Sequence, residues 1–299
     1  MTEFVVTGPT LLDGVPDEVY HGGLVRTPGP QTSQSALKLL IEPSTPREFQ
    51  HYLVTPAKPK RVFDVGHAAH TRVLGIGAEY TPCPLDLLDA RGAMTRNVAK
   101  EWAESEREAG RTPLHPDDYE AVVRMADAIL EHGRAAELFT DPARRPEVSA
   151  FHEATPGLWL RSRFDLLGGG LCDLKTTIDP HGGAWRGQAW RLGYHVQDVS
   201  YRRAYEAING TDPGPMTFIC VGKEAPHLVG VYTLNTEFER FGNEQLDAAL
   251  NCYLQQAAKH GLPDAEGVIW DGLPDTTAVL SPPRAAYYDA EGVDYEPTF

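Results

Sequence analysis

The segment LWLRSRFDLLGGGLCDLKTT, residues 158–177, is the part of the chain from which the fold is most readily predicted. Two runs typical of β-strands, Leu158–Leu167 and Leu171–Lys175, flank a triple glycine. A glycine-rich turn between two such runs predicts a β-hairpin. In that hairpin, Asp165 on the first strand would lie close to Asp173 on the second. The segment therefore predicts two neighbouring carboxylates on adjacent strands.

Lys175 adds an amine to this pair of carboxylates. Residues two apart in a strand point to the same face, so Asp173 and Lys175 share one. Two carboxylates and an amine at a sheet edge suit the binding of Mg²⁺ and a water molecule beside a phosphodiester. The spacing alone is a weak signal, because Asp173 and Lys175 would also make an ordinary solvated surface pair. A catalytic interpretation therefore needs support from other parts of the chain.

The composition is that of a globular protein and disfavours several classes of site. The 299 residues are enough for one large domain or two small ones. The first residues lack the basic and apolar regions of a secretory signal, and no apolar run is long enough to span a membrane. The four cysteines form no C-x-x-C pair, which argues against structural zinc and iron–sulfur sites. We therefore expect a cytoplasmic protein with reduced thiols and no membrane contact.

The net charge of −15 is unusual for a protein that binds nucleic acid, since such proteins normally have a basic surface. Arginines nevertheless cluster in pairs, for example Arg161 with Arg163 and Arg202 with Arg203. A basic channel within an acidic exterior would reconcile this charge with DNA binding. A protein that never binds DNA would have the same composition, so charge leaves both interpretations open.

The order of helical and strand patterns predicts a mixed α/β fold of the α+β kind. Helical patterns come first and include apolar spacing over Tyr119–Leu130 that is typical of a helix facing the core. Strand patterns follow, with two long helical patterns among them. These later elements are a strand over 147–153, the hairpin, a helix over Gln188–Asn209, strands over Met216–Gly222 and Leu228–Leu234, and a helix over Asn235–His260.

The same patterns divide the chain into three segments. Residues 1–32 are rich in proline and glycine and predict an irregular N-terminal arm. Residues 33–261 are expected to form one domain, with a helical layer over 33–140 and a core over 145–261. Residues 262–299 form a proline-rich acidic tail.

Two histidines, His67 and His70, lie three residues apart on a predicted helix over 62–75 and would reach the same side of it. Three interpretations remain open. The histidines would be packed or solvated without a chemical role, they would form a two-histidine zinc site, or one would join the carboxylates of the hairpin at a metal. No H-E-x-x-H motif surrounds them, which disfavours the zinc site.

A polar residue interrupts an aromatic stripe on the predicted helix over 188–209. Tyr194, Tyr201 and Tyr205 fall on the stripe, and such stripes usually pack into a core, where we expect Tyr205. Gln197 lies among them, and a buried glutamine needs hydrogen-bond partners. The stripe therefore predicts packing and singles out Gln197.

Four segments, in order, resemble motifs of the PD-(D/E)xK nuclease superfamily and of its exonuclease VIII (RecE-type) branch from phage recombination systems. With a start at Ser33/Ser35-x-Leu37 that is similar to the branch, the resemblance covers roughly residues 33–205. The sequence departs from the superfamily pattern at Phe164, where a proline is expected. The four segments are Gly66-x-Ala68-x-His70, the strand pair from Glu147 to Asp165, Asp173-Leu174-Lys175-Thr176-Thr177, and Gln197-(x)3-Tyr201.

The resemblance implies a restriction-endonuclease-like central sheet, flanked by helices, with a helical N-terminal layer. It implies that Mg²⁺ or Mn²⁺ binds to carboxylate oxygens of Asp165 and Asp173, to the Leu174 carbonyl and to His70. Glu147 would support this metal shell.

The resemblance also implies roles for the polar side chains beside the metal. Lys175, as a solvated amine, would orient or help to deprotonate the attacking water and would balance the phosphate charge. Gln197 and Tyr201 would hold the DNA strand or the frame of aspartates and lysine.

The activity implied by the resemblance is that of a metal-dependent exodeoxyribonuclease. Such an enzyme hydrolyses linear double-stranded DNA from 5′ to 3′ and leaves 3′ single strands for an annealing protein. It acts as a homo-oligomeric ring, in the host cytoplasm if the gene is carried by a phage. Two alternatives stay open: a nuclease-like module that binds DNA or a partner without cutting, and a non-nuclease metal hydrolase that uses His67 and His70. The intact set of Asp165, Asp173 and Lys175 disfavours the binding module.

Overall fold

The computed structural model describes residues 3–55 and 61–277. Residues 278–299, the greater part of the predicted acidic tail, lie outside the described residues. In the described part, no helix is long and apolar enough to cross a membrane.

The strands of the described residues form one large sheet and one small one. The larger is a seven-stranded mixed sheet in the order β1-β5-β6-β7-β8-β9, with β2 beside β6. The pairs β5–β6, β6–β7 and β8–β9 are antiparallel, and β7–β8 is parallel. The strands are β1 Thr10–Leu12, β2 Gln31–Ser33, β3 Tyr80–Pro82, β4 Thr112–Leu114, β5 Arg145–Thr155, β6 Leu158–Leu167, β7 Leu171–Thr177, β8 Thr217–Gly222 and β9 Val229–Thr233.

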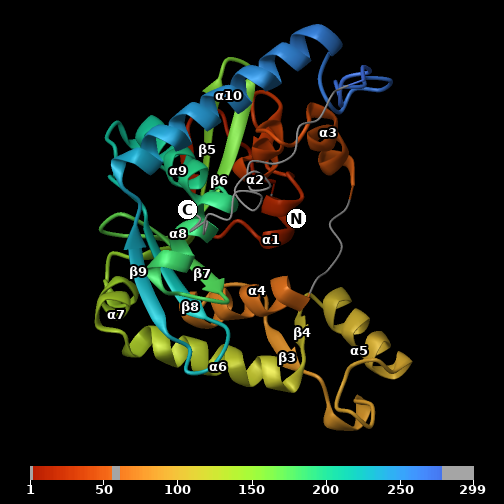
Figure 1. The fold of residues 1–299 in the computed structure, drawn as a ribbon, viewed down its shortest axis with the longest axis vertical. Helices are drawn as coiled ribbons and strands as arrows, with labels where there is room; N and C mark the ends of the chain where they lie inside the picture. The colour runs from red at the N-terminus through yellow and green to blue at the C-terminus, as the bar shows by residue number, and fades with distance from the viewer. Residues whose placement is uncertain (1–2, 56–60, 278–299) are drawn as a thin grey trace, which may run out of the picture.

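Helices flank this sheet on both faces, which confirms the predicted fold class (Figure 1). Within the described chain, the α-helices are α1 Asp17–His21, α2 Gln34–Leu37, α3 Pro46–Val54, α4 Arg61–Leu74, α5 Asn97–Glu108, α6 Pro116–Glu131, α7 Gly133–Thr140, α8 Gly182–Arg191, α9 Tyr194–Asn209 and α10 Thr236–His260. The 3₁₀ helices are η1 Lys38–Leu40 and η2 Leu85–Leu87.

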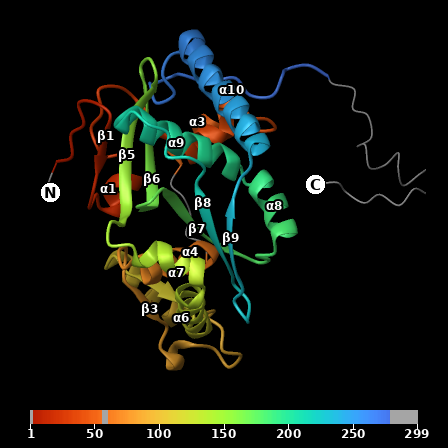
Figure 2. The ribbon, with the colours of Figure 1, turned by 90° about the vertical axis from the view of Figure 1, so that its left-hand side faces the viewer.

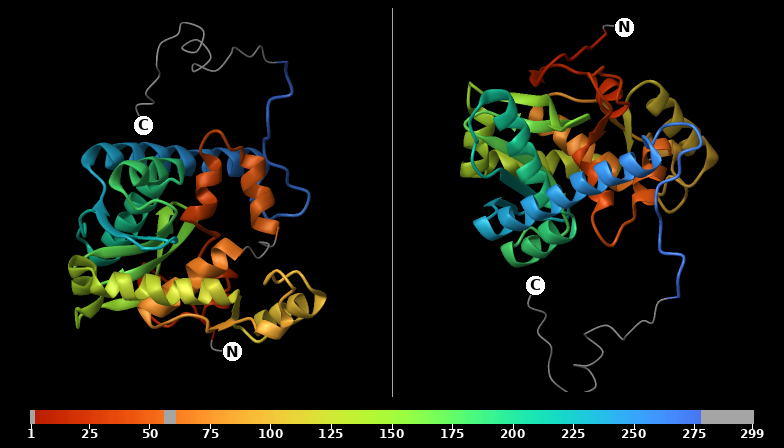
Figure 3. Two further views of the ribbon diagram at one scale, coloured as in Figure 1. Left: turned by 60° about the horizontal axis from the view of Figure 1, so that its bottom comes forward. Right: turned by 90° about the horizontal axis from the view of Figure 1, so that it is seen from above.

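Two hydrophobic clusters lie on opposite faces of the sheet. On one face, α4 and α6 pack against alternate residues of the central strands, among them Leu174 and Ile219. On the other, α8 and α9 pack against the residues between these, such as Phe218 and Cys220. The period of two along each strand explains the division, because successive side chains point to opposite faces. Figure 2 and the left view of Figure 3 show α6 (yellow) and α10 (blue) on opposite sides of the strands.

Local sequence signals account for where several helices begin. Thr45 and Glu48 form a capping box at the start of α3. Pro116 occupies the first turn of α6, where its missing N–H costs nothing. Asn235 accepts a hydrogen bond from the backbone of Phe238, as expected for the cap of α10.

The prediction of one helix over Gln188–Asn209 is wrong. The structure has two helices, α8 and α9, separated at Leu192 and Gly193. Gly193 has φ +66°, in the left-handed region that glycine adopts without strain, and this conformation turns the chain between the helices. The sequence pattern is helical on both sides of Gly193, so it predicted one continuous helix.

The N-terminal arm is more regular than predicted. Strand β1 pairs with β5, β2 pairs with β6, and α1 lies between them in sequence. The helical layer predicted over 33–140 also includes β3 and β4, which pair in a separate small sheet. Three-residue strands such as these are too short to show an alternating pattern, so the sequence did not reveal them.

Candidate active site

The candidate site lies where β6 and β7 separate. The two strands pair only beside their turn, through Leu166 with Cys172 and Leu167 with Leu171. The backbone N–H of Leu174 then donates to Oδ2 of the Asp165 side chain at 2.8 Å. A carboxylate thus accepts a hydrogen bond where a strand carbonyl would normally do so.

Asp173 and Lys175 form a close pair on β7. The Nζ of Lys175 lies 2.5 Å from Oδ2 of Asp173, and Nε2 of Gln197 donates to Oδ1 at 2.5 Å. A further hydrogen bond joins the side chains of Gln197 and Tyr201. Asp173 is only 2% exposed, so its charge depends on these partners. The predicted need of Gln197 for a buried partner is met by Asp173.

The expectation that Lys175 is a solvated amine is wrong. Its side chain is only 19% exposed, and its Nζ lies 4.9 Å from the centre of the Tyr194 ring. Burial opposes the charge of Lys175, but the carboxylates of Asp173 and Asp165 outweigh this effect and raise the pKa of the amine. Lys175 is therefore a half-buried cation that its carboxylate neighbours keep charged.

Asp165 also meets two residues from distant parts of the chain, His70 and Glu147. One ligand atom each from His70, Glu147 and Asp165 lies within 4.8 Å of the others, and these form the only such group of three among the described residues. Nδ1 of His70 is 3.4 Å from Oδ2 of Asp165. One nitrogen and two carboxylate oxygens at this separation suit a divalent cation.

The raised pKa values of Glu147 and Asp165 indicate that these two carboxylates are short of nearby positive charge. Burial, reinforced by the charge of Asp165, raises the pKa of Glu147 to about 8. Burial and the charge of Asp173 likewise raise the pKa of Asp165. Crowded, buried carboxylates are stabilised either by protons or by a cation, so the residues fit a divalent metal.

Backbone strain and a buried arginine position Glu147. Glu147 has φ +54°, a conformation that costs a side-chain-bearing residue about 1–2 kcal/mol. Nη1 of Arg163 lies 3.6 Å from Oε2 of Glu147 and 2.5 Å from Oδ1 of Asp17. The guanidinium also packs over the ring of Tyr20, 4.1 Å from its centre. The arm thus fixes the arginine that faces Glu147, an arrangement that the sequence did not signal beyond the pairing of Arg161 with Arg163.

The other predicted residues lie at or beside this site with differing contacts. Leu174 contributes its backbone N–H, while its carbonyl as a metal ligand stays a prediction. Tyr201 also packs against Phe164, with ring centres 5.3 Å apart. His67 is exposed and is not part of the group of three, so a site built on both histidines gains no support. Tyr205 packs against the core as expected.

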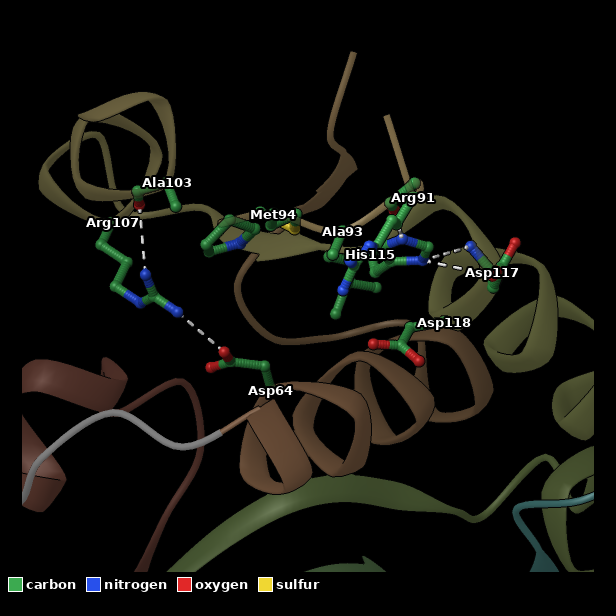
Figure 4. Close-up of a pocket in the computed structure, with 12 residues that line it drawn as sticks. Asp64, Arg91, Ala93, Met94, Ala103, Arg107, His115, Asp117 and Asp118 are labelled. Atoms are coloured by element: carbon green, nitrogen blue, oxygen red, sulfur yellow. Dashed lines mark hydrogen bonds and ion pairs between the residues drawn. The ribbon is translucent and has the colours of Figure 1, made fainter. Parts of the chain in front are cut away.

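Two pockets differ in their relation to these residues. A pocket of about 330 Å³ is lined by Glu147, one member of the group of three, and by Arg163. A larger one, of about 440 Å³, lies between α4, α5 and α6 and shares no residue with it (Figure 4). In its lining, Asp64 pairs with Arg107 at 2.8 Å, and His115 pairs with Asp117 at 3.5 Å. Chemistry therefore favours the smaller pocket.

Comparisons with known proteins identify the family and support the fold. A family model described as "PDDEXK-like domain of unknown function (DUF3799)" matches residues 33–268. The fold is similar to a crystal structure from Eubacterium rectale described as a "putative exonuclease", with a TM-score of 0.55 and 11% sequence identity. That match covers 86% of this chain and 91% of the other, and at this identity it supports the fold alone. No curated protein matches the sequence.

Proposed function

Because the chain belongs to the family of PDDEXK-like domains, we propose that it is a metal-dependent nuclease that cuts phosphodiester bonds where β6 and β7 separate. One observation carries the proposal. The buried pair of Lys175 and Asp173 lies beside Asp165, which also belongs to the group with His70 and Glu147. A fixed amine next to a cation-binding group is what hydrolysis of a phosphodiester requires.

His70, Glu147 and Asp165 are the residues that would hold Mg²⁺ or Mn²⁺. The bound ion would polarise the phosphate and favour ionisation of a water molecule. Asp173 and the Leu174 carbonyl are proposed as further oxygen ligands, in keeping with the preference of Mg²⁺ for oxygen. Arg163 keeps Glu147 directed at this group.

The remaining polar residues would act on the attacking water and the phosphate. Lys175 has donors to orient the water and a charge to offset that of the phosphate in the transition state. Asp173 keeps this amine protonated, because its carboxylate raises the pKa of Lys175 against the effect of burial. Gln197, supported by Tyr201, fixes the orientation of Asp173. Hydrolysis would then break a P–O bond of the DNA backbone.

The finer activity that we propose is that of an exonuclease of the RecE type. The substrate would be linear double-stranded DNA, digested from 5′ to 3′, and the 3′ strands would pass to an annealing protein. A homo-oligomeric ring would suit this activity. The resemblance of the four motifs supports these points, and the description of the Eubacterium rectale protein as a "putative exonuclease" agrees with the proposal of an exonuclease.

The test compares an end-labelled linear duplex with a covalently closed circle, in Mg²⁺ and in EDTA. We expect loss of the linear DNA alone, only with Mg²⁺, and none with Asp173→Asn. Asp264→Asn, at an exposed position outside the site, serves as the control and should cut like the wild type. The order in which 5′ and 3′ labels are released gives the polarity.

Other outcomes would change the proposal in defined ways. Cutting of both substrates would keep the nuclease and overturn the exonuclease. Binding of DNA without cutting would favour the alternative, a nuclease-like binding module. Digestion in EDTA would remove the metal from the proposal.

A further inference from the structure

A lysine outside the family-like motifs lies close to the candidate catalytic residues. Lys38 is the first residue of η1, directly after α2, and its Nζ donates to the carbonyl of Leu192 at 2.8 Å. Leu192 follows α8, which is tied to the catalytic strand by the hydrogen bond of 2.8 Å from Thr177 to Gln188. Lys38 thus reaches across from the N-terminal layer to the end of α8.

The break between α8 and α9 accommodates this lysine. A Cβ on Gly193 would lie 2.8 Å from Cδ of Lys38, so only glycine leaves room for the lysine stem in its present position. Tyr194 follows directly, and its ring lies beneath the Nζ of Lys175. A single turn of the chain therefore positions the stem of Lys38 and the ring under Lys175.

Lys38 is half-buried and has no carboxylate partner among the described residues. An ammonium has three N–H donors, and Leu192 uses one. Burial and repulsion by Lys175 lower the pKa of Lys38 to about 8, which places the two amines within each other's electrostatic range. Asp173 pairs with Lys175, and Asp165 also acts on that amine, so Lys38 keeps donors that a further anion could use.

A purely structural role would be to cap the C-terminal end of α8, as lysines often do. That role needs only one N–H donor of Lys38. It gains nothing from the nearby Lys175, whose positive charge makes the protonated form of Lys38 less favourable. A ligand that supplies negative charge explains both the unused donors and the repulsion.

We propose that Lys38 forms a phosphate-binding subsite that contacts a non-bridging oxygen of the DNA backbone beside Lys175. The inference rests on the proposed function and adds a substrate contact to it. Lys38 would hold the strand while Lys175 acts at the bond that is cut.

The experiment measures binding of a fluorescein-labelled duplex by anisotropy in EDTA, from 50 to 200 mM NaCl. Lys38→Gln removes the charge but keeps an N–H donor for Leu192, whereas Lys38→Met removes both. Both variants should bind less tightly at 50 mM salt, and the slope of log affinity against log salt should fall by about 1, the loss of one phosphate contact. Lys38→Arg should retain most of the slope. Lys259→Met, which removes an exposed lysine paired with Asp271, changes the net charge equally and should leave the slope unchanged.

The outcomes separate this inference from the proposed nuclease activity. An unchanged slope in Lys38→Gln, with or without a lower melting temperature in Lys38→Met, would overturn the subsite and leave the capping role. A reduced slope in the Lys38 variants, combined with a wild type that fails to cut the same duplex in Mg²⁺, would support the subsite and overturn the nuclease. Absence of any DNA binding by the wild type would overturn both.

Discussion

At the residue scale, the candidate site contains a charged pair, Asp173 with Lys175, in a position that is largely shielded from solvent. Asp173 is almost fully buried and depends on Lys175 and Gln197 for its partners. Buried ion pairs contribute little net stability compared with apolar residues of similar size, yet breaking one is costly. Such a pair is therefore best explained by chemistry rather than by packing.

Replacement of Lys175 by Met should affect both chemistry and stability. We expect cleavage to fall by about 10²–10³-fold, the usual contribution of one positioned donor that stabilises charge in the transition state. The variant should also lose about 3 kcal/mol in the free energy of unfolding, because Asp173 is left buried without its cation. The double variant Lys175→Met/Asp173→Asn should recover part of that stability and no activity. Urea denaturation and cleavage assays check both parts, and a fully stable Lys175→Met would refute the burial argument.

Glu147 should make the metal-free protein sensitive to pH. Its pKa in the folded state, about 8, is above its ordinary value of 4.5, so the folded state binds the extra proton between these values. The free energy of unfolding should therefore fall as pH rises through this window. Glu147→Gln should flatten the fall and raise the melting temperature in EDTA at pH 8 by a few degrees.

Mg²⁺ provides the control for this effect. A cation that binds the folded state alone stabilises it by about 2.7 kcal/mol at one hundred times its dissociation constant. Mg²⁺ should thus stabilise the wild type at pH 8 and stabilise Glu147→Gln much less. Equal stabilisation of both proteins, measured by calorimetry, would exclude Glu147 as a ligand.

At the element scale, the positions of the site residues depend on turns and local backbone conformations as well as on strands and helices. The strand pair and its triple-glycine turn were predictable, because a period of two and a glycine run are local signals. The break at Gly193 was not, because the same glycine fits inside a helix at a modest cost. Glu147 lay within a predicted strand, but its left-handed conformation depends on contacts with Arg163 and the arm.

The break can be tested with two glycines of similar conformation. Gly193 and Gly210 have φ +66° and +77°, and a Cβ would meet Lys38 at the first and nothing within 4 Å at the second. Each change to Ala should cost about 1–2 kcal/mol of stability from backbone strain. Only Gly193→Ala should also weaken DNA binding, by displacing Lys38. Equal DNA affinity in the two variants would contradict the role given to this turn.

At the scale of the whole molecule, topology unites residues that sequence separates. His70 comes from α4, Glu147 from β5 and Asp165 from β6, and they meet because α4 packs beside strands that pair in register. Motif resemblance pointed to His70 and Asp165, and it gave Glu147 only a supporting role. The roles of Arg163 and Lys38 could not be assigned from sequence. Arg163 is singled out by partners from distant elements, and Lys38 by the lack of a carboxylate partner among the described residues.

The net charge of the whole chain differs from the balance of charges at the candidate site. The net charge of −15 describes the whole chain, whereas at the candidate site two lysines and an arginine offset the charge of three carboxylates. Local potential near a site decides binding more than net charge does. DNA binding should therefore be strongly salt-dependent despite the acidic composition.

The most direct test of the central claim is the rate of phosphodiester cleavage as a function of Mg²⁺ concentration, for the wild type and Asp165→Asn. Asp165 belongs to the group with His70 and Glu147 and also accepts from the strand that carries Lys175. The account predicts a rate that rises with Mg²⁺ to a plateau in the wild type and stays at background in the variant. A rate in Asp165→Asn equal to that of the wild type, or cleavage independent of Mg²⁺, would contradict it.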